Sequence, residues 1–411
     1  MPWSRSAVAL LVCTAAAAAG DWPQWLGPNR DGSSPEKVAP WKEKPTVLWR
    51  QPVDEGHSSP VVAVGRVFLH TGVPDKNQEI VTAYDARTGK QLWRQTYERV
   101  PFLSPFGNGP RATPAVSDGK VYAFGITGVL TCFDAAEGKP LWQVDTLKKF
   151  GAKNLLFGMS CSPLVEGGRV LVAVGAKGAS VVAFDKDNGE VAWKSLDDKA
   201  SYSSPIVLGE GTERQVVFLT GEGVVSLSPT DGRLFWRYPL VDQLSESSTT
   251  PVHAGDLVLA STITKGTVGL QLESKQGKPA AKESWKNPDL TCYFSTPVPV
   301  GKEHVYLVTG TKPPALRVEA TLRCVEAKTG KELWQRPRVG KYHAALLRTG
   351  DDKLLMLEDS GNLVLLNPSP EKYAELARAQ VCGETWAHPA LAEGRLYVRD
   401  NKELICVQLG K

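Results

Sequence analysis

The chain has 411 residues, of which 42% are hydrophobic, and a formal net charge of +4 at pH 7. Because this apolar content is ordinary for a globular protein, wholesale disorder and a polytopic membrane protein are excluded. The sequence contains no block of basic residues, so we expect no nucleic-acid partner. The 38 glycines and 29 prolines favour many short strands that are joined by tight turns.

Residues 1–20 have the features of a signal peptide. Arg5 supplies a positive charge, an apolar stretch follows, and the alanine run at 15–19 offers a small-residue cleavage site. The apolar stretch is too short to span a bilayer of about 30 Å. Cys13 follows Val12, whereas a lipidation site requires a small residue there, so we expect an exported chain without a lipid anchor.

The mature chain contains no later apolar run of transmembrane length, so we expect a protein that does not span the membrane. It divides into an irregular N-terminal segment, residues 21–43, and one folded domain, residues 44–411. We expect residues 21–40 to lie outside the folded ring, so their removal should be much milder than removal of residues 1–51.

Five segments share an eleven-residue pattern that ends in tryptophan. A small residue comes first, an apolar and a polar residue follow, and glycine is always seventh. The segments are residues 83–93, 132–142, 183–193, 226–236 and 324–334, and their glycines are Gly89, Gly138, Gly189, Gly232 and Gly330. A degenerate sixth copy ends at Trp285, with Gly277 displaced by one position. This fixed spacing indicates a repeat architecture.

A second periodicity marks the start of each repeat. Small polar residues and a proline precede an apolar strand at Pro60, Pro114, Pro163, Pro205, Pro251, Pro297 and Pro389. An equivalent strand after His343 lacks the proline. Each unit therefore reads as four antiparallel strands in about 40 to 50 residues, which is the size of a propeller blade.

The strand openings predict eight blades. The last unit, residues 386–409, supplies only three strands, and an unassigned strand at residues 47–50 carries Trp49. We therefore predict an all-β, eight-bladed β-propeller of four-stranded antiparallel blades, with the ring closed by the N-terminal strand. In the seventh blade, residues 374–381 have strong helix formers, but blade geometry favours a fourth strand there.

The repeated tryptophans are predicted to be structural. Each indole ring would dock on a neighbouring sheet, beside a small residue that leaves room for it, while the glycine supplies a positive φ in the turn. The docking residues are Trp49, Trp93, Trp142, Trp193, Trp236, Trp285 and Trp334.

The eleven-residue pattern resembles the tryptophan-docking repeat of pyrroloquinoline quinone (PQQ) dehydrogenases and of the BamB-like propeller of outer-membrane assembly. It is most similar to a family of secreted PQQ-like repeat proteins. The likeness covers nearly all of residues 21–411 and is carried by residues 21–32 (DWPQWLGPNRDG), 109–114 (GPRATP) and 201–205 (SYSSP). It implies the propeller fold, but one fold hosts many functions.

The resemblance to quinoprotein dehydrogenases implies PQQ and calcium in the central funnel, often beside a disulfide of adjacent cysteines. This sequence has no Cys-Cys pair, and no residue three positions before an opening proline is acidic. Calcium needs several oxygen ligands, and Glu246, Asp289 and Glu384 are scattered along the chain. We therefore expect no catalytic residue, no metal site and no cofactor, and PQQ with calcium is the alternative.

Other chemistry has less support. The chain has no GxSxG elbow, no P-loop and no CxxC, HxxxH or HxH pair. Cys132, Cys324 and Cys406 occupy the small first position of repeats, so we expect free core thiols there. The sequence does not indicate how Cys161, Cys292 and Cys382 would pair.

The sequence points to the mouth of the central channel as the recognition surface. Cationic and aromatic residues gather at the strand openings, where such residues serve recognition or simply fill the funnel. They are His57, Arg111, Tyr202, Tyr293, Phe294, Tyr342, His343, Trp386 and His388. We therefore predict a monomeric binding or scaffold module for a protein or small ligand, with a PQQ-dependent oxidoreductase as the alternative.

Overall fold

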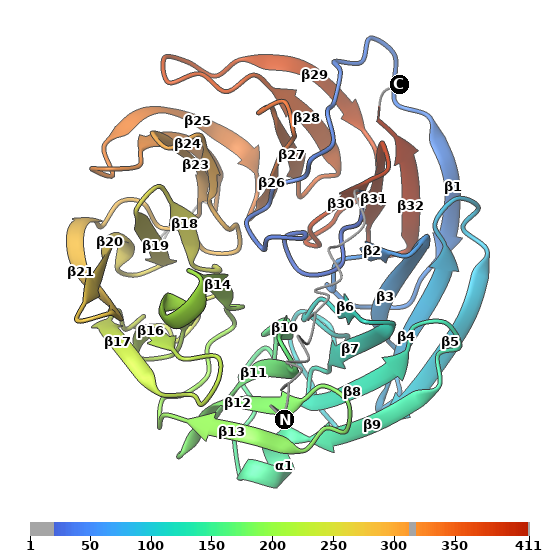
Figure 1. The fold of residues 1–411 in the computed structure, drawn as a ribbon. Coiled ribbons are helices and arrows are strands. Elements are labelled where there is room, and N and C mark those ends of the chain that lie inside the picture. Colours follow the sequence, from blue (N-terminus) through green and yellow to red (C-terminus); the bar gives the residue numbers. More distant parts are fainter. Residues whose placement is uncertain (1–19, 312–317, 410–411) are drawn as a thin grey trace, which may run out of the picture.

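The computed structural model describes residues 20–311 and 318–409. In this part of the chain the strands form eight four-stranded antiparallel sheets, which surround a central axis like the blades of a propeller (Figure 1). The prediction of an all-β fold with eight four-stranded blades is confirmed. Residues 1–19, which hold most of the predicted signal peptide and Cys13, lie outside the described residues.

The first four blades follow chain order from the innermost strand to the outermost. Blade one contains β2 (Val61–Ala63), β3 (Arg66–Gly72), β4 (Gln78–Asp85) and β5 (Gln91–Glu98). Blade two contains β6 (Ala115–Ser117), β7 (Lys120–Phe124), β8 (Val129–Asp134) and β9 (Pro140–Asp145). Blade three contains β10 (Leu164–Glu166), β11 (Arg169–Ala176), β12 (Ala179–Asp185) and β13 (Val191–Ser195). Blade four contains β14 (Ile206–Leu208), β15 (Gln215–Leu219), β16 (Gly223–Leu227) and β17 (Leu234–Pro239).

The next three blades keep this order, and the eighth departs from it. Blade five contains β18 (Val252–Ala254), β19 (Leu257–Thr262), β20 (Gly266–Lys275) and β21 (Lys278–Asn287). Blade six contains β22 (Val298–Val300), β23 (His304–Thr309), β24 (Ala320–Glu326) and β25 (Glu332–Gly340). Blade seven contains β26 (Ala344–Arg348), β27 (Leu354–Glu358), β28 (Asn362–Leu366) and β29 (Glu375–Gln380). Blade eight contains β30 (Ala390–Ala392), β31 (Arg395–Arg399), β32 (Glu403–Gln408) and β1 (Val47–Pro52).

Strands from both ends of the chain therefore share the eighth blade. β1 pairs antiparallel with β32, and Arg50 lies opposite Ile405. Trp49 donates its indole N–H to the backbone carbonyl of Ala86 in blade one, at 3.1 Å. Apolar side chains of blades seven, eight and one form one buried cluster, so the eighth blade packs against both of its neighbours.

The burial of a strand follows from its place in the blade. The second and third strands are sandwiched between neighbouring blades, and β3 and β12 are accordingly buried along almost their whole length. The outer strands have one covered face, so β5 buries Trp93 and Tyr97 and exposes most residues between them. In blade seven, β29 is a strand, as the blade geometry predicted.

Helix is confined to short segments in the described residues. α1 (Thr146–Phe150) follows β9, begins at the cap Asp145 and ends at Gly151 in the left-handed conformation. The 3₁₀ turn η1 (Gly211–Glu213) joins β14 to β15. No helix in this part of the chain has the length and apolar character to cross a membrane.

Each repeat tryptophan lies directly opposite the small residue that opens its repeat. Ala83 pairs with Trp93, and Cys132 pairs with Trp142. The ring then extends to the turn of the following blade, where glycine stands. A Cβ added to Gly138 would lie 2.5 Å from the ring of Trp93. This distance is too short for any side chain at the position. Glycine is therefore needed here for space as well as for its positive φ of 75°.

Two tryptophans depart from this arrangement. Trp236 donates to Gln215 of its own blade at 2.8 Å, because the β20–β21 hairpin of the next blade is long and carries Gly277 away. A Cβ at Gly277 would meet nothing within 4 Å. Trp334 donates to the carbonyl of Ser369, in the proline-rich turn of blade seven, at 2.8 Å.

The irregular N-terminal segment does not lie outside the ring, and this expectation was wrong. Trp22 bridges to Val62 of blade one, and Arg348 of blade seven donates its amide to Gly32 at 2.7 Å. In Figure 1 the first, dark blue residues lie among the inner strands β26, β30 and β2. The segment is held by backbone groups that the inner strands leave unpaired toward the channel, so it fills the centre of the propeller.

Arg30 anchors this central plug, which we define as residues 21–36. The side chain is 2% exposed. Its guanidinium donates to the carbonyls of Pro205 at 2.7 Å, Pro163 at 3.0 Å and Ser162 at 3.1 Å. These carbonyls belong to the openings of blades three and four, so one buried cation ties the plug to both. Burial lowers the pKa of Arg30 to about 10, and the side chain remains charged at neutral pH.

Candidate ligand site at the channel mouth

The residues that precede the inner strands converge on one cavity of about 280 Å³ at the mouth of the channel. We call this cavity the aromatic cup. Eight of the predicted mouth residues line it: His57, Arg111, Tyr202, Tyr293, Phe294, Tyr342, Trp386 and His388. His343 does not line the cup. It is buried beside it, where its Nδ1 lies 2.9 Å from the hydroxyl of Ser295.

Sequence reasoning missed several residues of the cup. Phe106 and Phe157 enter it from the long connections that follow blades one and two, and Trp25 enters it from the plug. Glu246 lines the wall and accepts a hydrogen bond from the hydroxyl of Tyr293. The sequence feature that could have pointed to Phe106 is the length of the connection at residues 99–114. Most connections in compact domains are shorter, and long ones often carry functional residues.

Aromatic rings form a continuous wall around the cup. Trp386 stacks on His57, with ring centroids 5.4 Å apart, and on Phe294 at 5.5 Å. Phe106 lies 5.6 Å from Trp386 and 5.4 Å from Phe157. Because each ring rests on another, the wall is fixed by packing before any ligand arrives.

Arg111 shapes this wall rather than presenting a free charge. Its guanidinium donates to the carbonyls of Gly107 at 2.8 Å and Phe106 at 3.2 Å, to the hydroxyl of Ser104 at 3.1 Å, and to the carbonyl of Gly109. These contacts fold the connection that carries Phe106. Burial lowers the pKa of Arg111 to about 10, so the guanidinium stays positive at pH 7.

His57 is neutral at physiological pH. Its Nε2 lies 3.0 Å from the carbonyl oxygen of Phe106. Burial and the positive charge of Arg111 lower the pKa of His57 to about 4. The ring therefore serves as an aromatic surface beneath Trp386 and as one more tie on the connection of blade one.

The floor of the cup combines Trp25 with a buried imidazole. The ring of His388 lies 4.7 Å from that of Trp25, edge to face, and 5.3 Å from that of His343. Neither ring nitrogen of His388 has a hydrogen-bond partner among the described residues, and the same holds for Nε2 of His343. Burial holds the pKa of His388 well below its usual range.

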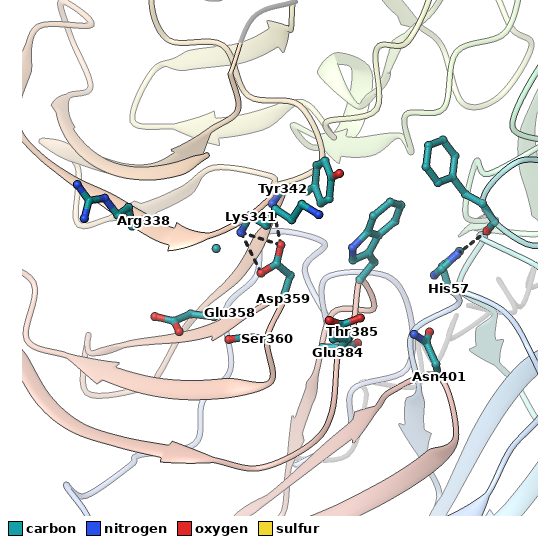
Figure 2. A pocket seen from close by; sticks show the side chains of 13 residues that line it. His57, Arg338, Lys341, Tyr342, Glu358, Asp359, Ser360, Glu384, Thr385 and Asn401 are labelled. Atoms are coloured by element: carbon teal, nitrogen blue, oxygen red, sulfur yellow. Dashed lines mark hydrogen bonds between the residues drawn. The ribbon is translucent and has the colours of Figure 1, made fainter. Parts of the chain in front are cut away.

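A second, more polar cavity of about 490 Å³ adjoins the cup over blades six to eight (Figure 2). Asp359 accepts the backbone amides of Lys341, Tyr342 and His343, the shortest of these at 2.7 Å. This carboxylate thereby fixes the turn that places Tyr342 at the mouth. Glu384 also lines the polar cavity, apart from Glu246 in the cup.

The carboxylate, histidine and cysteine side chains of the described residues do not form a site that suits calcium and a bound quinone. Within the residues described, no group of three or more His, Cys, Asp or Glu side chains could hold a metal ion. Asp289 lies in a separate surface cavity near Arg323. The cysteines of residues 20–311 and 318–409 are all buried and free, and burial raises the pKa of Cys161 to about 11 and of Cys292 to about 12.

A family model described as "Outer membrane protein assembly factor BamB" matches residues 76–336 and 318–408. The chain belongs to this family. BamB of Burkholderia pseudomallei is 24% identical over 305 residues, which cover 71% of this chain and 69% of that protein. The PQQ-like, BamB-like repeat that the sequence pattern predicted is thus confirmed.

Quinoprotein dehydrogenases are also similar to this BamB-family chain. Quinoprotein alcohol dehydrogenase PedH of Pseudomonas putida is 31% identical over 148 residues, which cover 33% of this chain and 24% of PedH. The match thus spans about a quarter of that enzyme. The structure of quinohemoprotein alcohol dehydrogenase from Comamonas testosteroni gives a TM-score of 0.65 at 16% identity, covering 97% of this chain and 82% of that one. This likeness shows a common fold.

Proposed function

We propose that this BamB-family propeller is an exported, non-catalytic binding or scaffold module that holds its partner at the channel mouth. One observation carries the proposal, namely the aromatic cup. The connections that supply Phe106 and Phe157 to the cup also carry exposed apolar side chains, and we call Leu103, Leu156 and Phe106 the rim. Leu103 is 87% exposed, Leu156 is 69% exposed and Phe106 is 49% exposed. Apolar side chains that gather beside a preformed aromatic cavity are typical of recognition surfaces.

The rim is supported by buried contacts, which suits a surface that binds without rearranging. Arg99 donates to the carbonyls of Val100 at 3.0 Å and Asn108 at 3.3 Å. The side chain of Asn108 in turn accepts the amide of Ser104 at 2.9 Å. The connection that carries Leu103 and Phe106 is therefore preorganised, which reduces the entropy lost on binding.

The rim can be tested by sedimentation of the protein after gentle extraction from the producing cell. We expect the unaltered chain to sediment as part of a larger complex, and the double variant Leu103→Ser/Leu156→Ser to sediment as the free chain. The matched control is Leu92→Ser/Leu141→Ser, two exposed leucines on the outer strands β5 and β9. If both double variants sediment at the same rate, the channel mouth is not the surface that binds the partner.

Quinoprotein catalysis is the alternative function, favoured by the similarity to PedH. The purified protein with PQQ and calcium should then oxidise alcohols with an artificial electron acceptor. We propose that it does not, because the carboxylates Glu246 and Glu384 line different cavities. Turnover that requires both PQQ and calcium and is lost in Glu384→Ala would reverse this ranking.

A further inference from the structure

The aromatic cup suits an uncharged ring. Its charged side chains are already bonded within the protein, because Arg111 donates to four oxygen atoms of its own connection and Glu246 accepts from Tyr293. Most of the side chains that line the cup are aromatic, and such side chains pack favourably against another aromatic ring. The cavity of about 280 Å³ has room for one ring, since an apolar cavity of about 150 Å³ in another protein takes up benzene.

The aromatic cup and the polar cavity meet at four side chains. Both cavities are lined by His57, Phe106, Tyr342 and Trp386, which we call the shared boundary. This boundary is open to solvent, because Phe106 is 49% exposed and the other three side chains are half-buried. A molecule whose ring lies in the cup can therefore extend a short polar group over the boundary into the polar cavity.

Five charged side chains line the polar cavity, and three of them are engaged within the protein. Asp359 accepts the backbone amides of the turn at residues 341–343. Glu358 accepts from the guanidinium of Arg378 at 2.8 Å. Arg338 lies 3.6 Å from a carboxylate oxygen of Glu319. These three groups are therefore not the ones that would select a ligand.

The two remaining charges have opposite signs. The ammonium of Lys341 lies 4.9 Å from the ring centre of Tyr342 and has no carboxylate partner in the described part of the chain. Glu384 has no cationic partner among these residues and stands two positions before Trp386. In Figure 2, Lys341 lies beside Tyr342, and Glu384 lies beside Thr385, around the same cavity. One positive and one negative group thus adjoin residues of the shared boundary.

A ligand that matches this arrangement joins an uncharged ring to two opposite charges. A free amino acid carries an ammonium and a carboxylate on one carbon atom at neutral pH, and in an aromatic amino acid one methylene group joins that carbon to the ring. We propose that the channel mouth binds a free aromatic amino acid, with its ring in the cup, its carboxylate toward Lys341 and its ammonium toward Glu384. This inference rests on the proposed function, because it names a small ligand for the same mouth.

Ligand-observed NMR titrations at pH 7 and low salt test the assignment with four probes that share one ring. L-Phenylalanine carries both charges, 3-phenylpropanoate carries only the carboxylate, 2-phenylethylamine carries only the ammonium, and toluene carries neither. We expect L-phenylalanine to bind roughly two- to fivefold more tightly than either singly charged probe, which is the gain from one exposed ion pair. Toluene should bind most weakly.

Two substitutions remove one charge each. Glu384→Gln should lower the affinity for L-phenylalanine to that for 3-phenylpropanoate and should not weaken 3-phenylpropanoate. Lys341→Gln should lower the affinity for L-phenylalanine to that for 2-phenylethylamine and should not weaken the amine. Both side chains are exposed, so the fold should persist. The matched controls Glu371→Gln and Lys372→Gln, in the exposed proline-rich turn of blade seven, should leave all four affinities unchanged.

N-Acetyl-L-phenylalaninamide tests whether the ring arrives on a polypeptide instead. It keeps the ring and replaces both charges with amides, so it should bind more weakly than L-phenylalanine. Binding as tight as that of L-phenylalanine would overturn the assignment of a free amino acid. So would equal affinity for L-phenylalanine and toluene, or a preference for L-phenylalanine that both charge variants retain. The sedimentation test of the rim uses no small ligand, so the proposed function can hold or fail separately.

Discussion

At the scale of single residues, two constraints act on the seventh-position glycine of the repeat. The turn requires a positive φ, which is 75° at Gly189. The ring of Trp142 from the preceding blade also occupies the space of a side chain, since an added Cβ would lie 2.7 Å from it. The sequence predicted the first constraint, whereas the second depends on which blade each tryptophan contacts.

A matched pair of substitutions separates these constraints. Gly277 has a φ of 70° and open space around it. Gly277→Ala should therefore report backbone strain alone, and Gly189→Ala should cost a further ~1–3 kcal/mol because alanine overpacks the site. Denaturant unfolding of the two variants measures the difference. Equal losses of stability would mean that the tryptophan does not constrain the turn.

The buried histidines predict that stability depends on pH. Burial lowers the pKa of His57 and of His343 to about 4, and that of His388 well below its ordinary 6.5. The unfolded chain binds protons at these rings from about pH 6.5 downward, while the folded chain resists until about pH 4. The free energy of unfolding should therefore be fully present above pH 6.5 and fall between pH 6.5 and 4.

His388→Phe isolates one of these contributions. Removing one ring should reduce the slope of stability against pH by up to about 1.4 kcal/mol per pH unit within that window. Denaturant unfolding at pH 7, 6, 5 and 4.5 gives the slope for both proteins. An unchanged slope would contradict the assignment of His388 as a buried neutral ring.

The mouth shows how far single residues are predictable. His57, Tyr202 and Trp386 follow from their fixed distance before an opening proline, because the repeat sets where each inner strand begins. Trp25 and Phe106 stand in segments without periodicity. Their positions depend on contacts with distant parts of the chain, such as the bond from Trp25 to Thr250 at 2.8 Å, which no local pattern encodes.

At the scale of elements, β1 supplies the fourth strand that the last repeat lacks. The last unit supplies three strands, and β1 occupies the edge of β32. Trp49 contacts Gly89 of blade one as Trp93 contacts Gly138 of blade two. Removing β1 would leave the edge of β32 open to pairing with other chains.

Trp49→Ala and Trp93→Ala should therefore cost similar amounts, about 3–5 kcal/mol each. The two rings are equally buried, at 8% exposure, and occupy equivalent places at different positions along the chain. Thermal melting of both variants measures this. If Trp49→Ala is silent while Trp93→Ala is not, the eighth blade does not depend on the N-terminal strand.

The central plug is the element that sequence reasoning misplaced. Composition identified it as irregular, which is correct, but an irregular segment can be buried when other elements satisfy its backbone. Its main tie, Arg30, contacts carbonyls more than a hundred residues away. Such partners become visible only after the blades are placed around the axis.

Arg30→Ala should destabilise the fold, because at least two buried carbonyls lose their donor at about 1–3 kcal/mol each. The control is Arg233→Ala, an exposed arginine that packs over Phe235 and should change stability by about 0.5 kcal/mol or less. Chemical denaturation compares them. Equal, small effects would mean that Arg30 does not anchor the central plug to blades three and four.

At the scale of the whole molecule, the blades, the plug and the connections between blades together build the aromatic cup. Trp25 of the plug lines this cavity, and the connections that follow blades one and two add Phe106 and Phe157. The same fold serves proteins named as assembly factors and as dehydrogenases, so the fold was predictable and the function was not. In this chain the aromatic cup is lined mainly by aromatic side chains, and its charged groups Arg111 and Glu246 are bonded within the protein.

Site-specific photocrosslinking in the producing cell tests the central claim most directly. A photoreactive phenylalanine analogue is placed at Leu103 on the rim and, as a control, at Leu92 on the outer strand β5. The account predicts discrete crosslinked products from position 103, reduced by Phe294→Leu within the cup, and none from position 92. Products from position 92 alone, or equal products from both, would contradict a binding module that acts through its mouth.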